Sequence, residues 1–122
     1  MTPVRQPPAT DDQMTLSVSS AGQGMVVSVG GEVDMLTSPR LRAGALEALD
    51  AQSPRTVLAL DGVTFLGTSG LAVLVEIRDA AEAAGVQLRL ACTSRSVLRP
   101  LTIAGLIPLF DVHESLTTAL AD

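Results

Sequence analysis

The sequence is poor in reactive and aromatic side chains. It contains no lysine, tryptophan or tyrosine, only two phenylalanines, one cysteine and one histidine in 122 residues. Without a second cysteine, Cys92 excludes an internal disulfide and a multi-cysteine metal site, and its place at the end of an apolar run predicts a buried, inert thiol. His113 has no neighbouring cysteine or second histidine, so it predicts a surface-loop residue and no metal ligand.

The missing lysine also limits the possible chemistry. A phosphate loop of the Gly-x-x-x-x-Gly-Lys kind cannot be formed, and the one histidine has no evident serine and aspartate partners for nucleophilic catalysis. No cofactor motif is present. The sequence therefore predicts a protein that is not an enzyme and carries no cofactor or metal.

Charge and hydropathy exclude two further classes of partner. The net charge is −5, all eight basic residues are arginine, and they form no cluster, which disfavours nucleic-acid binding. No apolar run approaches the roughly 20 residues of a membrane span. Residues 1–12 lack the apolar core of a signal peptide. We expect a cytoplasmic protein that binds no membrane.

What is present is an alternation of short apolar runs and helical patterns. Residues 1–13, rich in proline and aspartate, predict a disordered tail, and residues 20–24 predict a turn longer than two residues between the first two strands. The expected strands cover residues 14–19, 25–29, 56–60, 86–92 and about 109–112. The expected helices cover about 37–51, 68–84, 95–104 and 115–121, with Pro100 making the third short, kinked or late in starting.

The most informative stretch of the sequence runs from the strand at 56–60 into the next expected helix. The apolar strand at 56–60 is followed by the polar group Gly67, Thr68, Ser69 and Gly70, which opens an alanine-rich helix. We expect the hydroxyl of Thr68 or Ser69 to cap that helix. A helix N-terminus carries partial positive charge and tolerates a phosphate. A cap alone, however, predicts no chemistry.

The wider pattern resembles the STAS domain family. In that family the loop reads Asp-Ser-Ser/Thr-Gly-Leu, and its first hydroxyl residue, which is phosphorylated, matches Thr68, while the second matches Ser69. Gly70 and Leu71 complete the match, and Gly67 stands where the family has aspartate.

A second signature of the family, Gly-Glu-Val/Leu-Asp, is intact at residues 31–34. The resemblance implies that Gly31, Glu32 and Asp34 form a partner surface together with residues 67–71. It covers the chain from about residue 14 to the end. The implied fold is a single α/β STAS-like domain at 14–122, a mixed sheet of four to five strands with about four helices packed on it, several of them on one side.

The function implied by the resemblance is that of an anti-sigma factor antagonist. Such a protein binds an anti-sigma factor kinase while unphosphorylated and so frees the sigma factor. Phosphorylation, here at Thr68 or at Ser69, would end binding, and a phosphatase would reset the switch. Two alternatives stay open. Gly67 favours an interaction module that is not regulated by phosphorylation, and some similar domains are proposed to sense nucleotides or other small ligands.

Overall fold

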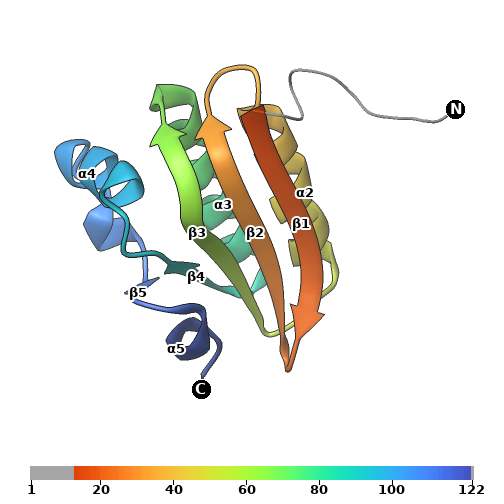
Figure 1. The fold of residues 1–122 in the computed structure, drawn as a ribbon. Coiled ribbons are helices and arrows are strands. Elements are labelled where there is room, and N and C mark those ends of the chain that lie inside the picture. The colour runs from red at the N-terminus through yellow and green to blue at the C-terminus, as the bar shows by residue number, and fades with distance from the viewer. Residues whose placement is uncertain (1–12, 122) are drawn as a thin grey trace, which may run out of the picture.

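The computed structural model describes residues 13–121 and contains one mixed sheet with the strand order β1-β2-β3-β4-β5 (Figure 1). β1 and β2 pair antiparallel, and every later pair is parallel, because a helix between consecutive strands returns the chain to the edge where the strands begin. The strands are β1 (Met14–Ala21), β2 (Gly24–Val33), β3 (Arg55–Leu66), β4 (Gln87–Ala91) and β5 (Val112–His113). The predicted tail at 1–13 lies outside the described residues, except for Gln13.

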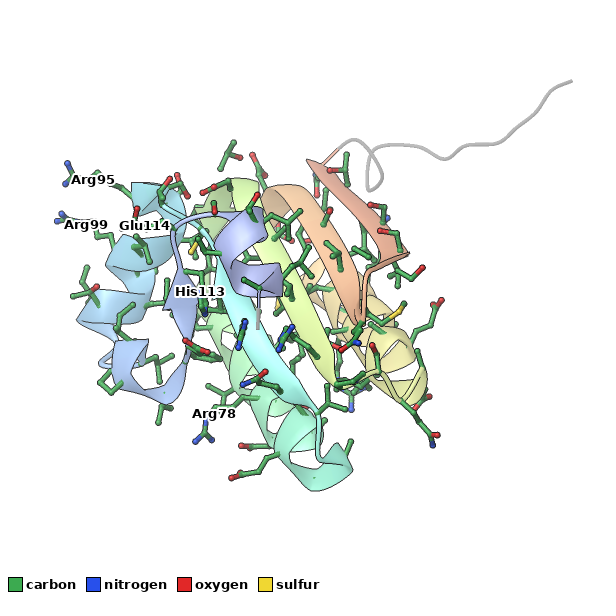
Figure 2. All side chains as sticks on the ribbon, turned by 90° about the horizontal axis from the view of Figure 1, so that it is seen from below. Arg78, Arg95, Arg99, His113 and Glu114 are labelled. Carbon is green, nitrogen blue, oxygen red and sulfur yellow. The ribbon has the colours of Figure 1, made fainter. Side chains whose placement is uncertain are left out.

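The helices lie on both faces of the sheet. They are α2 (Ser38–Asp50), α3 (Thr68–Ala84), α4 (Arg95–Ile103) and α5 (Leu116–Leu120). The first three share the main core, whereas Ala119 of α5 packs against Val57 and Ala91 on the other face. Figure 2, seen from below, places α5 on one side of the sheet and α2 and α3 on the other. The mixed five-stranded sheet and four helices confirm the predicted fold, with α2, α3 and α4 on one side of the sheet and α5 on the other.

The main core is almost entirely aliphatic. Leu58 and Leu90 from neighbouring strands meet Leu74 and Ile77 of α3, and all four are fully buried. Leucine and isoleucine recur on one side of α3 at helical spacing, so a single face of that helix covers the parallel strands. The buried thiol of Cys92 joins this core, as its sequence position predicts.

Two strands are longer than the sequence suggests. β2 continues past residue 29 to Val33, and β3 continues past residue 60 to Leu66, with Val33 paired to Leu66. The pairing contains register shifts between Ser28 and Gly30 and between Gly31 and Glu32. Glycine and charged residues therefore mark irregular pairing here and not the ends of strands.

Other boundaries are also corrected. The hairpin pairs Ala21 with Gly24, so its turn is the two residues Gly22 and Gln23, and the expected longer turn was wrong. Residues 107–109 form a 3-10 turn, and the last strand is Val112–His113. His113 therefore lies in a strand, not in a surface loop.

His113 is mostly buried, and its Nε2 lies 3.1 Å from Oδ1 of Asp111 without hydrogen-bond alignment. Ser115 caps α5 by accepting a hydrogen bond from the N–H of Thr118. Pro100 sits inside α4, which has nine residues, so the expectation of a short helix holds.

Among the described helices, none is long and apolar enough to cross a membrane.

Candidate partner-binding site

The two sequence signatures meet at one edge of the sheet. Because β2 and β3 are parallel, both end at the same edge, which is the upper one in Figure 1. The N–H of Gly67, just after β3, donates to the carbonyl of Val33, the last residue of β2, at 2.9 Å. The residues 31–34 and 67–71 are therefore neighbours in the folded chain.

The start of α3 differs from the prediction. Gly67 is the N-cap, with φ −89° and ψ −179°, and its carbonyl accepts the N–H of Leu71 at 3.0 Å. Thr68 and Ser69 are the first two helical residues, so neither hydroxyl caps the helix. Because Gly67 is the extended residue before the helix, the first helical hydrogen bond starts at its carbonyl, one residue earlier than if Thr68 were the N-cap.

The absence of capping leaves both hydroxyls unengaged. Thr68 is exposed and Ser69 is half-buried, and neither side chain makes a hydrogen bond within residues 13–121. The first turn of α3 also has N–H groups without helical partners. Thr68 thus combines access from solvent with a location where added negative charge is tolerated.

Gly70 is required by close packing. A Cβ at this position would lie 2.6 Å from Cδ1 of Leu66 and 2.8 Å from Cγ1 of Val33. Only a residue without a side chain allows the first turn of α3 to rest directly on the ends of β2 and β3. Gly70 is buried, so its contribution to a partner surface is indirect, through the position of Thr68 and Ser69.

Asp34 supports a tight turn after β2. Its Oδ1 accepts the N–H of Leu36 at 2.9 Å and that of Thr37 at 3.0 Å. The buried hydroxyl of Thr37 accepts the N–H of Asp34 at 2.9 Å and donates to the carbonyl of Glu32 at 2.8 Å. The backbone hydrogen bond from Thr37 is the largest cause that lowers the pKa of Asp34 below its ordinary value of 3.8. The carboxylate of Asp34 is therefore engaged by backbone N–H groups of residues 36 and 37 and fixes the shape of this turn.

Thr37 is the N-cap residue of α2, but its hydroxyl bonds to Glu32 and Asp34 and not to the N–H groups of the helix. Gly31 has φ +87°, and a Cβ there would collide with the carbonyl oxygen of Gln13, so Gly31 serves the backbone geometry. Glu32 is exposed, so its carboxylate is accessible to a partner. Leu71 is half-buried against the main core.

The structure adds apolar side chains that the sequence reading missed. Met35 is 74% exposed, Leu36 is 65% exposed and Phe65 is 52% exposed, all beside the two signatures. Adjacent Met35 and Leu36 follow a strand without joining a helix, which is the signal that could have revealed them. Exposed apolar clusters mark interaction surfaces.

A groove extends this surface from the start of α3 to α4. Its volume is about 400 Å³, and its lining includes Phe65, Thr68, Leu71, Arg99 and Ile103. Within residues 13–121, no three metal-ligating side chains come together. An accessible hydroxyl on a largely apolar groove suits the binding of another protein.

Comparison with known proteins agrees with this geometry. A family model described as "STAS domain" matches residues 15–119. The anti-sigma-F factor antagonist RsfB of Mycobacterium tuberculosis is 29% identical over 111 residues, which cover 89% of this chain and 88% of that protein.

Solved structures give the same picture. An anti-sigma factor antagonist from Mycobacterium paratuberculosis superposes with a TM-score of 0.82 at 29% identity, over 89% of this chain and 92% of the other. Unphosphorylated SpoIIAA superposes with a TM-score of 0.70 at 17% identity, over 85% and 92% of the two chains, and thus shares the fold.

Proposed function

This chain belongs to the STAS domain family, and on that premise we propose that it is an anti-sigma factor antagonist. In this proposal it binds an anti-sigma factor kinase while unphosphorylated, and the sigma factor is then free. The names of the relatives from the two Mycobacterium species support the assignment. The chain would act as a binding partner and kinase substrate, not as a catalyst.

The exposure of Thr68 is the observation that supports a specific phosphorylation site. The hydroxyl of Thr68 is exposed and unbonded within the described residues, and it lies between the turn of Asp34 and the apolar groove toward α4. A kinase can reach this hydroxyl, and a partner that covers the surface must cover it too. Ser69 is half-buried and is the second candidate.

Phosphorylation of Thr68 would change this surface strongly. It adds about 1.5 to 2 negative charges at neutral pH. The N-terminus of α3 tolerates that charge within the free protein, whereas an apolar partner surface does not. A loss of about 3 kcal/mol weakens binding more than a hundredfold, since each 1.4 kcal/mol is tenfold. A phosphatase would restore binding.

A second candidate is an interaction module that is not switched by phosphorylation. Gly67 favours it, because the family has aspartate at this position. The backbone of Gly67 is extended and suits any residue, but a Cβ there would lie 3.1 Å from Cε2 of Phe65. Aspartate at 67 would therefore require the ring of Phe65 to move by a few tenths of an ångström.

Mass spectrometry after incubation with ATP and each anti-sigma factor kinase of the same genome tests the proposal. One added phosphate that is lost only in Thr68→Ala supports the switch at Thr68. Loss only in Ser69→Ala moves the acceptor by one residue. Binding without phosphate transfer supports the unswitched module, and Gly67→Asp is then the variant that tests whether the missing carboxylate is the cause. No binding to any such kinase overturns the proposal.

A further inference from the structure

Two arginines take no part in holding the fold together. Of the seven arginines in residues 13–121, five bond to other parts of the chain, whereas Arg95 and Arg99 make no hydrogen bond or ion pair there. The bonded five are Arg40, Arg42, Arg55, Arg78 and Arg89. Both unbonded arginines are exposed and lie four residues apart on α4, where Figure 2 shows them projecting to the same side of the helix.

Their positions do not stabilise α4. Arg95 is the first residue of the helix, where the helix dipole disfavours positive charge. Like charges four residues apart on a helix also repel each other. The positive charges of Arg95 and Arg99 are therefore available to a binding partner.

Apolar surface accompanies this charge. Ile103, at the end of α4, is 74% exposed. It lies between two hollows: the groove of about 400 Å³ that also contains Thr68, and a second of about 380 Å³ lined by Arg95, Leu98, Arg99, Thr102 and Ile103. Arg99 and Ile103 line both hollows. We define the residues of the second hollow as the α4 surface.

We propose that the α4 surface docks an acidic segment of the anti-sigma factor, with an apolar side chain of that segment against Ile103 and carboxylates against Arg95 and Arg99. The partner's identity rests on the proposed function, because the α4 surface continues the groove that contains Thr68. Charge complementarity determines the chemistry of the segment. The chain carries a net charge of −5, so it repels acidic segments in general and attracts them at this unpaired basic site.

The test measures the Kd of the full chain for the anti-sigma factor that binds it, at low and at physiological salt. Arg95→Ala/Arg99→Ala should weaken binding about tenfold and reduce its salt dependence. Ile103→Ser should weaken it about fivefold with the salt dependence unchanged. The matched control is Gln23→Glu/Gln52→Glu, which changes the net charge by the same amount at exposed positions near the opposite end of β3 and should bind within about twofold of wild type.

Because Arg95 and Arg99 bond nothing in the described chain and their charges disfavour α4, the double variant should keep or slightly raise the wild-type melting temperature. Wild-type affinity in the arginine and Ile103 variants overturns the α4 inference and leaves the proposed function intact. An equal loss in the control pair also overturns it, since only net charge would then matter. A dimer of this chain that Ile103→Ser dissociates, without change in anti-sigma binding, overturns it in favour of a second copy as occupant. Failure of wild type to bind any anti-sigma factor overturns both proposals.

Discussion

Asp34 and Thr37 exchange hydrogen bonds: the carboxylate of Asp34 accepts the N–H of Thr37 at 3.0 Å, and the hydroxyl of Thr37 accepts the N–H of Asp34 at 2.9 Å. The two residues close a turn whose intervening side chains, Met35 and Leu36, are exposed. The aspartate of the Gly-Glu-Val-Asp signature therefore holds the turn that presents these two apolar side chains to solvent.

Replacing Asp34 by asparagine should destabilise the protein in a pH-dependent way. The pKa of Asp34 is lowered in the folded state, so its stabilising contribution is present above the ordinary pKa of 3.8 and is lost as the pH falls through the folded value. Urea unfolding of wild type and Asp34→Asn should therefore differ at neutral pH and converge in acid. Asp50→Asn, at the exposed end of α2, is the control because this carboxylate accepts no hydrogen bond within the described residues, and its free energy of unfolding at neutral pH should stay close to that of wild type. A difference that persists in acid would assign the effect to shape and not to charge.

Gly70→Ala should lower the free energy of unfolding by about 1–3 kcal/mol, the usual cost of overpacking. The added methyl group meets the stiff, branched side chain of Val33 at 2.8 Å and Leu66 at 2.6 Å. Chemical denaturation measures the change. Ser69→Ala, in the same helical turn, adds no atoms and should stay within about 0.5 kcal/mol of wild type. Equal stability of the two variants would show that α3 can move away from the strands at no cost.

Thr68→Glu should separate binding from stability. We expect binding to the anti-sigma factor to weaken about tenfold or more, because a carboxylate enters an apolar contact surface. The same charge at the N-terminus of α3 should leave the free energy of unfolding unchanged or raise it by about 0.3–1 kcal/mol. Calorimetric titration and thermal melting measure the two effects. Thr68→Gln is the neutral control of similar size, and equal binding by both variants would contradict a role for charge.

Cys92 should resist alkylation in the native protein. Burial, followed by the negative charge of Asp61, raises the pKa of its thiol from 9.0 to about 11, so at pH below 9 the thiolate is about a hundredfold scarcer than for an ordinary cysteine. Since the side chain is also 2% exposed, iodoacetamide should label it far more slowly in buffer than in urea. Ser19→Cys/Cys92→Ala provides an exposed thiol on β1 as control. Fast native labelling of Cys92 would contradict the buried, inert thiol.

The prediction of the fold succeeded where periodicity was strong. The aliphatic run at 56–60 and the helix that Gly85 ends in a left-handed conformation, φ 71°, were recognisable because a buried strand and a one-sided helix repeat their apolar residues regularly. Prediction failed at Gly30, Gly31 and Gly62, which lie beyond the expected strand ends but within paired strands. Whether glycine ends a strand or lies in a bulge depends on the partner strand, and one strand's sequence does not contain that information.

The candidate site divides in the same way. The hydroxyl pair Thr68 and Ser69 was found from its motif, but the cap proved to be Gly67, because the backbone after β3 stays extended for one more residue. Met35, Leu36 and Ile103 were missed. Their exposure depends on which neighbours cover them, and those neighbours are distant in sequence.

By itself, the sequence determined the class of this protein: an aliphatic α/β domain of acidic charge, without disulfide or phosphate loop, carrying two short signatures of one family. Composition and local periodicity suffice for this, because each residue contributes to them independently of distant contacts. The tertiary structure decided what the signatures do. In the folded chain, Gly67 is hydrogen-bonded to Val33 and the carboxylate of Asp34 is hydrogen-bonded within its own turn. Thr68 remains accessible and lines the same groove as Arg99. These relations arise only when parallel strands bring separate segments to one edge of the sheet, which is a property of the packed chain.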